Sequence, residues 1–581
     1  MPARIFCRKA HTTGLDLTSF PVRLSRWTPA AIPNLNFVTE FMRRDLERLA
    51  NERFDLLIIG GGVTGACVAR DATLRGLSVA LVEKNDFAHA TSAHNSKLVH
   101  GGLRYLRNLE LALVRESLKE RRIWQRIAPH LVQPLPFLVP LYGAGFAARA
   151  TLAAGLTLYD MLSFDRTWLD DPDQRLPGHT WFGTDAAEAR EPMLTATKFE
   201  GAFLYYDAQM YAPERLALEC ILDASDNGAA VANHLEASGL LIRDGKVEGA
   251  TLRDAAGGET FDVRARLTLL TAGPWADIFL ACALGHASSH KLMRSKGIHL
   301  VVPAMTRGDA LTVAAGGGHF FVLPWRGHSI VGTTDTAFAG APDDVGVSEA
   351  DIESFLGFVN AHLTNANLTR GDVQHFYAGL RPLVDDGSGD TYDASRRAEL
   401  IDHGRDDGVQ GLMSAIGGKW TTSRDLAQKT VDAVMHKLPA KRRPCVTGFE
   451  PLPGGRIDRF SEFLKRQSPN VPNAEHLVRL YGARVDAMMA AAGNRPELRA
   501  PLSPTGDLGA QVLFAIREEM ASTLEDVVMR RTGIGQLGYP GDKCVEDVAS
   551  LMTAELGWSD ARKQAEIRSL KPIFRTMDGV A

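Results

Sequence analysis

Three glycines and one acid near the start of the chain form its clearest chemical pattern. Gly60, Gly62 and Gly65 have the spacing G-x-G-x-x-G, and Glu83 ends the next apolar run. In such a motif the first glycine permits a tight turn, the second lets the backbone approach a pyrophosphate, and the third lets a helix pack against a strand. The acid is placed to hold a ribose diol. We therefore expect a dinucleotide to bind here.

The residues around this motif predict half of a dinucleotide-binding fold. The apolar run 54–59 is typical of a buried parallel strand, a helical stretch follows as far as Leu74, and 77–82 is a second apolar strand. The pyrophosphate would lie at the N-terminus of the helix, where free N–H groups favour negative charge. FAD and NAD share this fingerprint, so the motif alone does not choose between them.

Three later segments could contact the rest of such a cofactor. The polar stretch 91–97 offers donors to phosphates and a ribityl chain, although taken alone it is more typical of an ordinary loop. The segment 271–275 ends a strand, and 416–422 places glycines before a helix whose N-terminus would stabilise negative charge on a reduced flavin. The candidate cofactor-binding residues are Gly60, Gly62, Gly65, Glu83, Thr91, Ser92, Ser96, Lys97, Gly273, Gly417, Gly418 and Thr421.

The order of these motifs resembles the FAD-dependent, quinone-linked glycerol-3-phosphate dehydrogenase family, in its bacterial aerobic form. The resemblance is carried by G-G-G-V-T-G-A-C-V-A-R-D, S-K-L-V-H-G-G-L-R-Y-L, T-A-G-P-W-A-D, K-G-I-H, V-G-T-T-D, G-L-R-P-L and G-G-K-W-T-T-S-R, which follow one another between Phe54 and Arg424. The stretch L-E-D-V-V-M-R-R-T at 524–532 is similar to the family's helical C-terminal domain. Residues 1–50 have no recognised counterpart.

The resemblance implies a bound FAD and oxidation of sn-glycerol 3-phosphate to dihydroxyacetone phosphate, with hydride transfer from C2 to flavin N5 and electrons passed to a membrane quinone. A phosphate dianion needs fixed cations, and the planar fork of arginine matches it well. Arg381 is favoured because related amino-acid-oxidase-like flavoproteins hold a substrate anion with the arginine of G-x-R-P. The candidate substrate-binding residues are Arg104, Tyr105, Arg381, Arg396 and Lys419.

The candidate catalytic residues are Arg381, His299 and Lys419. A general base must lie within hydrogen-bond reach of the C2 hydroxyl, and histidine is the side chain that titrates nearest neutral pH. His299 is therefore the candidate by residue type, although a structural or cofactor-contacting histidine fits the sequence equally well. Each arginine named above has a plainer interpretation too, because a lone arginine is usually solvated or paired at the surface.

The elements that must position these residues predict an α/β fold of the amino-acid-oxidase-like type. We expect an FAD-binding, Rossmann-like domain at 53–105, 216–289 and 373–435, threaded by an inserted antiparallel-sheet domain at 106–215 and 290–372 that binds substrate and faces the membrane. Apolar runs on both sides of Arg326 and Gly327 predict a hairpin in the inserted domain. After Pro453 the pattern becomes helical, so an all-helical C-terminal domain is expected at 450–581.

The first 50 residues are expected to form a separate N-terminal extension. Basic, serine and threonine residues are frequent in it, which is typical of an organellar transit peptide. The plainer interpretation is a disordered tail, or a start codon assigned too early, with Met42 as the true start. The C-terminal region contains no D-x-[DN]-x-[DN]-G loop, so the calcium-binding region of the mitochondrial relatives is not expected and a bacterial-type enzyme is favoured.

Composition excludes several other classes of protein. The 581 residues are 45% hydrophobic and 23% charged, and the formal net charge of −4 gives no general attraction to nucleic acid. The six cysteines are scattered without a C-x-x-C pair, which argues against a disulfide framework, an iron–sulfur cluster or a zinc site and favours a reducing compartment. We expect no metal, and the sequence is compatible with a homodimer.

Membrane contact is expected to be peripheral, on the inner face of a bacterial cytoplasmic membrane. The longest stretch without charge is interrupted by prolines, so no spanning helix is predicted. A basic stripe near Trp124 would suit anionic headgroups, but taken alone it is more typical of a solvated face paired with Glu116 and Glu120, and only the family resemblance favours membrane contact. The apolar segment 146–162 could insert shallowly or belong to the core. The stripe consists of Arg115, Lys119, Arg122 and Arg126.

Several alternatives stay open at this stage. An oxidase of the same fold would return the electrons to O2, and the sequence separates it poorly from a dehydrogenase. An amino-acid-oxidase-like enzyme for another anion is less favoured, because several basic candidates suit a phosphate dianion better than one carboxylate. A non-catalytic flavin-binding protein is disfavoured since Arg104, Arg381 and Lys419 are all present. A nicotinamide-dependent dehydrogenase would not explain the later motifs.

Overall fold

A computed structural model of the chain describes residues 42, 44–106, 108–143, 145–194, 199–255, 257–286, 291–315, 318–363, 365–384, 398–439, 441 and 443–580. Met42–Ala581 forms one compact unit. The unit therefore begins inside the extension that was expected to reach residue 50. Helix α1 (Leu46–Asn51) is capped by the Asp45 side chain and buries Leu49 against the first sheet, which explains why these residues fold with it.

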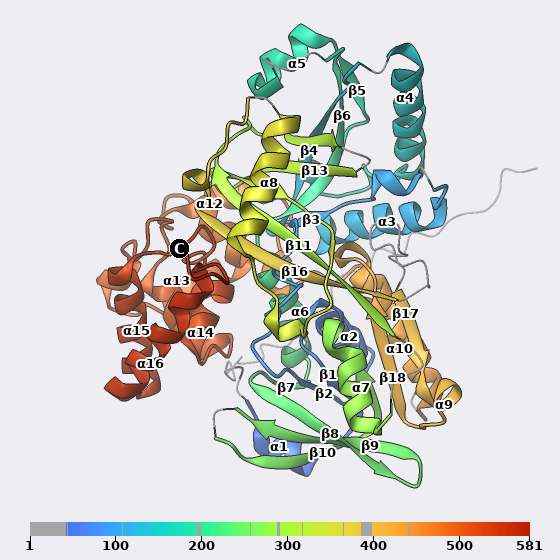
Figure 1. Cartoon of the computed structure of the whole chain (residues 1–581). Coiled ribbons are helices and arrows are strands. Elements are labelled where there is room, and N and C mark those ends of the chain that lie inside the picture. Colours follow the sequence, from blue (N-terminus) through green and yellow to red (C-terminus); the bar gives the residue numbers. More distant parts are fainter. Residues whose placement is uncertain are drawn as a thin grey trace, which may run out of the picture. The chain divides into compact units, whose positions relative to one another are not determined.

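The first sheet has a parallel core that carries the predicted dinucleotide motif (Figure 1). Its central strand β1 (Arg53–Ile59) lies between β2 (Val79–Val82) and β10 (Thr260–Leu270), and β7 (Ala230–Ala232) and β18 (Leu412–Gly417) continue the parallel order on either side. Strand β17 (Ala398–Asp402) is an antiparallel edge, and β8 (Leu235–Arg243) and β9 (Lys246–Asp254) form a hairpin joined to β10.

Both faces of this sheet are covered, which explains the unbroken apolar run of β1. Helices α2 (Val63–Leu74), α6 (Pro213–Asp226) and α10 (Ser423–Lys437) share a core on one face. The β8–β9 hairpin and helix α7 (Ala276–Leu284) share a core with the other face. The short helix α9 (His403–Asp406) follows β17.

The second sheet is mostly antiparallel and forms the inserted domain. Its order is β15-β11-β14-β13-β12-β4-β6-β3, with β16 also paired to β11 and β5 to β6. The strands are β3 (Leu98–Val99), β4 (Val132–Pro140), β5 (Thr180–Phe182), β6 (Ala202–Met210), β11 (Leu292–Pro303), β12 (Ala310–Ala315), β13 (Gly318–Trp325), β14 (His328–Gly332), β15 (Thr336–Ala337) and β16 (His375–Val384). Helices α5 (Thr184–Arg190) and α8 (Glu349–His362) share a core with one face, and α3 (Leu111–Ile127) and α4 (Gly145–Leu162) with the other.

The predicted hairpin is confirmed, because β13 and β14 pair antiparallel and close through Arg326 and Gly327, both with positive φ. Two expected boundaries differ from the structure. Strands β3 and β16 were placed in the cofactor segments 53–105 and 373–435, yet they pair within the second sheet. The alternation of apolar residues that predicts a strand does not say which sheet the strand will join.

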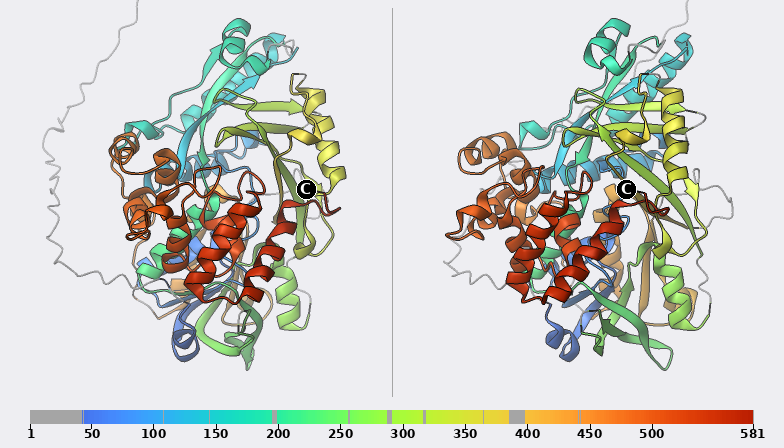
Figure 2. Two further views of the ribbon diagram at one scale, coloured as in Figure 1. Left: turned by 90° about the vertical axis from the view of Figure 1, so that its left-hand side faces the viewer. Right: turned by 60° about the vertical axis from the view of Figure 1, so that its left-hand side comes forward.

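The C-terminal region is helical, as predicted, and its helices group together in both views of Figure 2. They are α11 (Phe460–Gln467), α12 (Ala474–Tyr481), α13 (Val485–Ala490), α14 (Gly509–Glu518), a π-helix (Asp526–Arg531), α15 (Asp542–Leu556) and α16 (Asp560–Leu570). Residues of α12, α13 and α14 share one continuous hydrophobic core with α2 and α6. No helix among the described residues is long and apolar enough to cross a membrane.

Candidate functional site

A cavity of about 1130 Å³ opens where the carboxyl ends of the parallel strands meet the second sheet. Its lining includes the residues that directly follow β1, β2 and β10, namely Gly60, Glu83 and Thr271. The second sheet contributes Phe321 from β13 and Arg381 from β16. The cavity exceeds the usual volume of a pocket for one small ligand, and it lies at the edge of the sheet where α/β folds bind nucleotides.

The glycine motif has the geometry that a pyrophosphate site requires. Gly60 has a φ of +112°, and a Cβ atom there would lie 2.7 Å from the Thr271 carbonyl oxygen. A Cβ atom on Gly65 would overlap the Gly60 carbonyl oxygen, so the helix packs this close only without a side chain. Gly62 is the N-cap of α2 and has no side chain to cap the helix, although the Ser92 hydroxyl accepts the N–H of Val63. The first turn of the helix borders the cavity through Gly62 and Val63, as anion binding at a helix N-terminus needs.

Glu83 lies on the cavity wall with its carboxylate oriented by the backbone. One oxygen accepts the N–H of Gly61 at 2.7 Å and the other accepts the N–H of Asn85 at 2.9 Å. Burial raises the pKa of Glu83, and the two N–H donors offset part of this effect. Beyond it, Lys84 forms an ion pair with Asp343, a pair of cavity residues that the sequence did not indicate.

The polar stretch 91–97 divides between the cavity and the protein interior. Thr91 donates to the Leu380 carbonyl at 2.6 Å, and the Ser92 hydroxyl accepts the N–H of Val63 at 2.9 Å. Thr91, Ser92 and Ser96 line the cavity. Lys97 is not among its lining residues: the ammonium is buried 4.8 Å from the centre of the Trp325 ring, and burial lowers the pKa of Lys97 to about 8. Lys97 is therefore placed to support the wall rather than to contact a cofactor.

The remaining cofactor candidates come from the ends of β10 and β18. Gly273, Gly417 and Gly418 all have positive φ and line the cavity. Thr421 lies in the turn before α10, and its hydroxyl accepts the N–H of His100 at 3.2 Å. The predicted arrangement, glycines followed by a helix N-terminus at the cavity, is therefore present. The residues fit a dinucleotide, because a phosphate cradle, a ribose-holding acid and this second helix terminus surround one space.

Three basic substrate candidates line the same cavity. The Lys419 ammonium lies 4.3 Å from the centre of the Tyr105 ring, and the Arg104 guanidinium carbon lies 5.0 Å from it. Lys419 also donates to the Ser117 hydroxyl at 2.7 Å. Arg381 borders the cavity from β16. The fourth candidate, Arg396, lies outside the described residues.

Arg381 is held by neighbours that fix its guanidinium plane. It donates to the Ser295 and Thr333 hydroxyls at 3.0 and 2.9 Å and to the Thr334 carbonyl at 3.2 Å. A Cβ atom on Gly297 would overlap the guanidinium, so this glycine makes room for it. A pre-positioned arginine loses little freedom when it binds an anion.

His299 is placed differently from the expectation for a base. It is not among the described residues that line the cavity, but Ser96 is. The Nε2 atom of His299 lies 2.9 Å from the Ser96 hydroxyl. The ring is 2% exposed and stacks on Tyr377 at 5.0 Å between centroids. Burial, reinforced by the charges of Arg381 and Lys97, holds the pKa of His299 well below its usual value. His299 therefore reaches the cavity through the Ser96 hydroxyl.

Sequence reasoning missed three histidines on the cavity wall, His89, His100 and His319. His100 was available, because it is the histidine of L-V-H-G-G-L-R-Y, directly before the segment that contains Arg104 and Tyr105. His319 comes from β13 and carries no motif, so only the pairing of the second sheet brings it to the cavity.

The basic stripe on α3 is largely paired within the protein. Arg115 and Arg122 both contact the buried carboxylate of Asp165, at 2.8 and 2.9 Å, and not the glutamates that were expected to pair with them. Trp124 is fully buried and donates to the Thr421 carbonyl at 3.0 Å. Asp165 comes from the segment after α4, so its approach to α3 could not be predicted from helical spacing.

Known proteins that are similar to this chain also point to a flavin site. Residues 55–424 match the family of FAD dependent oxidoreductases, and residues 445–563 match the C-terminal domain of alpha-glycerophosphate oxidase. A glycerol-3-phosphate dehydrogenase of Synechocystis sp. is 36% identical over 551 residues, covering 90% of this chain and 97% of that protein. Glycerol-3-phosphate dehydrogenase 2 of Mycobacterium tuberculosis is 35% identical over 532 residues, covering 90% of this chain and 88% of that protein.

A solved structure has the same fold over almost its whole length. It is the glycerol-3-phosphate dehydrogenase from Bacillus halodurans complexed with FAD, with a TM-score of 0.72 and 27% identity. The match covers 91% of this chain and 95% of that one.

Proposed function

This chain belongs to the FAD-dependent glycerol-3-phosphate dehydrogenase family, and on that premise we propose that it oxidises sn-glycerol 3-phosphate at C2 to dihydroxyacetone phosphate. The observation that carries the proposal is that Arg104, Arg381 and Lys419 line the same cavity as the dinucleotide motif. A dianionic substrate needs such fixed cations beside the cofactor. Several cations suit a phosphate better than the single carboxylate of an amino acid.

We assign the phosphate of the substrate to Arg104 and Lys419. Both cations lie within 5.0 Å of the centre of the Tyr105 ring, and all three residues line the cavity. A dianion bound beside this ring would be attracted to both cations. Arg381, fixed by Ser295 and Thr333, would then hold the hydroxyl end of the substrate, away from the phosphate.

Oxidation at C2 also needs an acceptor for the hydroxyl proton. When bound, FAD supplies the acceptor for the hydride. We propose that His100 takes the proton, because it lies on the cavity wall and its backbone is fixed by Thr421. His299, our candidate by residue type, would act through Ser96 and orient that hydroxyl. The low pKa of His299 keeps its ring neutral at physiological pH but makes it a weak base.

We propose a membrane quinone as the electron acceptor, with an oxidase that uses O2 as the alternative. The match to a family named for an alpha-glycerophosphate oxidase keeps that alternative open. Peripheral membrane contact is supported by exposed apolar side chains on α4 and the segment after it. Phe146 is 87% exposed, Met161 67% and Trp168 64%, and exposed apolar side chains of this size can enter the apolar layer of a membrane interface.

Replacing Lys419 tests the assignment of the phosphate. We expect Lys419→Met to raise the KM for sn-glycerol 3-phosphate at least about tenfold, because a charge-assisted hydrogen bond is lost. The FAD content of the purified enzyme should not change. The matched control is Lys429→Met on α10, where the side chain is 59% exposed and pairs with Glu116 and Asp425. An unchanged KM in the Lys419 variant would contradict this role.

The proton acceptor is tested by comparing two histidines. We expect His100→Gln to slow flavin bleaching by sn-glycerol 3-phosphate by about 10²- to 10⁴-fold, the range for loss of a general base. His299→Gln should keep most of the rate, since its amide can still bond the Ser96 hydroxyl. The reverse order of effects would assign the proton to His299 through Ser96.

Membrane contact is tested with vesicles. Phe146→Asp should reduce co-sedimentation of the enzyme with phosphatidylglycerol vesicles, because a charge in the apolar layer is costly. Ile242→Asp is the control, as Ile242 is 43% exposed and lies on β8 of the first sheet, whereas α4 packs on the second sheet. Equal loss in both variants, or in neither, would count against α4 as the contact surface.

A further inference from the structure

The loop after β2, residues 83–92, contains a carboxylate that does not line the cofactor cavity. Asp86 follows Glu83 by three residues and is completely buried. One of its oxygens accepts Arg531 and Asn233, at 2.7 and 2.8 Å, and the other accepts Arg530 and Arg531, at 2.6 and 2.7 Å. Asp86 therefore receives four hydrogen bonds, and three of them come from the C-terminal domain.

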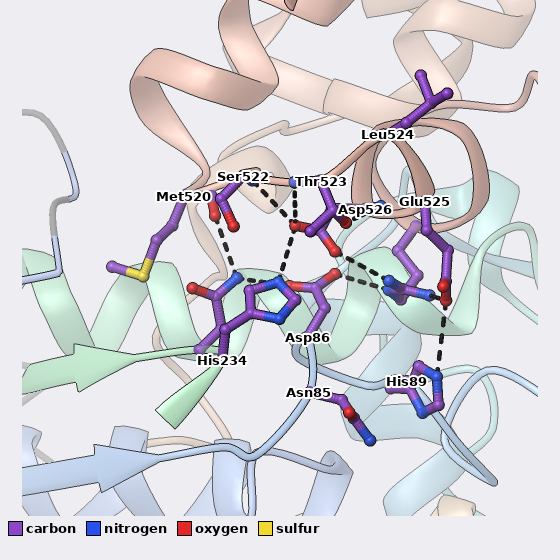
Figure 3. A network of polar contacts seen from close by, with 12 residues as sticks. Asn85, Asp86, His89, His234, Met520, Ser522, Thr523, Leu524, Glu525 and Asp526 are labelled. Carbon is purple, nitrogen blue, oxygen red and sulfur yellow. Dashed lines mark hydrogen bonds and ion pairs between the residues drawn. The ribbon is translucent and has the colours of Figure 1, made fainter. Parts of the chain in front are cut away.

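The two arginines belong to the π-helix Asp526–Arg531. The same π-helix also contacts His234 in the cofactor-domain segment 216–289. Asp526 accepts the N–H groups of Ser522 and Thr523 at 2.9 and 3.0 Å, and its carboxylate lies 3.0 Å from Nε2 of His234 (Figure 3). Short π-helical segments are rare and occur often at functional sites. Here the segment brings two consecutive arginines to one carboxylate.

In this network the carboxylates of Asp86 and Asp526 pair with Arg530 and Arg531. Burial lowers the pKa of His234, but its bond to Asp526 and the charge of that carboxylate outweigh burial and raise the pKa above its usual value. The ligand atoms of Asp86, His234 and Asp526 lie within 4.8 Å of one another, yet Arg530 and Arg531 already bond the carboxylates. The cluster is therefore an internal ion-pair network.

On its other side the loop forms the wall of the cofactor cavity. Glu83, Lys84, Asn85 and the segment 89–92 all line the cavity. The backbone of the loop is hydrogen-bonded to β7 and to His234, which follows it. The backbone N–H of His234 donates to the Asn85 carbonyl at 2.7 Å, and the backbone N–H of Glu83 donates to the Ala232 carbonyl at 3.0 Å. The loop also meets the glycine turn, where the N–H of Ala88 donates to the Gly61 carbonyl at 3.0 Å.

We propose that Arg530 and Arg531 are positioning residues for FAD: through Asp86 they hold the loop that carries Glu83, so that the C-terminal domain sets how firmly the cofactor is bound. The C-terminal helices thus support the cofactor site without lining it. This role requires only the FAD site and does not depend on the substrate or the electron acceptor.

The test is the rate of FAD release from the holoenzyme, followed by the rise in flavin fluorescence after dilution. Arg531→Lys removes the two-pronged contact with Asp86 and keeps the charge. We expect FAD to leave at least about tenfold faster, because charge-assisted bonds that orient the ribose-holding acid are lost. The loop 83–92 should also exchange its amide hydrogens faster.

Arg215→Lys is the matched control. Arg215 is equally buried and bonds Glu519 of the C-terminal region with two contacts, at 2.9 and 2.8 Å. It also donates to the Arg531 carbonyl at 2.8 Å, so Arg215→Lys disturbs the end of the same π-helix, but no hydrogen bond among the described residues joins Arg215 to Asp86 or to the loop. Both variants should lose thermal stability, and only Arg531→Lys should release FAD faster. Equal release from both variants, or none beyond wild type, would overturn the proposal and leave a purely structural role.

A second variant guards against failure to fold. If Arg531→Lys is not recovered, Arg530→Lys removes one bond to Asp86 and leaves the pair between Arg531 and Asp86 intact. We expect a smaller acceleration of FAD release in the same direction. Wild-type release from this variant would contradict the proposal.

Discussion

The close approach of Gly60 to the end of β10 is the constraint on which the site depends. A side chain at Gly60 would lie 2.7 Å from the Thr271 carbonyl oxygen, and one at Gly65 would overlap the Gly60 carbonyl. Strand, turn and helix can therefore meet only with glycine at these positions. This packing keeps the N-terminus of α2 at the sheet edge, where β2 delivers Glu83 and β18 delivers Gly417 and Gly418. The cavity is the space that these turns leave against the second sheet.

Residues fixed by backbone geometry could be predicted from the sequence. The glycines, Glu83 and the turn before α10 follow from motifs whose spacing encodes the turn itself, and the structure places all of them around one cavity except Gly65, whose role is in packing. Arg104, Arg381 and Lys419 were found through the family resemblance and line the same cavity.

Residues whose role depends on distant partners could not be predicted in this way. His299 was chosen by residue type, but its surroundings on β11 bury it behind Ser96. Lys97 was grouped with its polar neighbours, yet its left-handed backbone, with a φ of 56°, accompanies a side chain that lies among aromatic rings and not on the cavity wall. The pairing of Arg115 with Asp165 depends on where the segment after α4 folds back. No local pattern records such contacts.

The role of the C-terminal helices also depends on distant partners. The sequence marked them as a separate domain, whereas the structure gives them a common core with α2 and α6 and an ion-pair network with the loop after β2. The cofactor-binding half of the chain is thus stabilised from a region that contributes no residue to the described cavity wall.

If one cavity holds FAD beside a site for a phosphorylated triol, the substrate should reduce the flavin directly. This is measured by anaerobic mixing of the purified enzyme with sn-glycerol 3-phosphate while the flavin absorbance is followed. We expect rapid bleaching by this substrate and none by glycerol, followed by reoxidation that is faster with a quinone analogue than with air. Bound FAD that does not bleach with sn-glycerol 3-phosphate would contradict the presence of this substrate site and leave only the cofactor site standing.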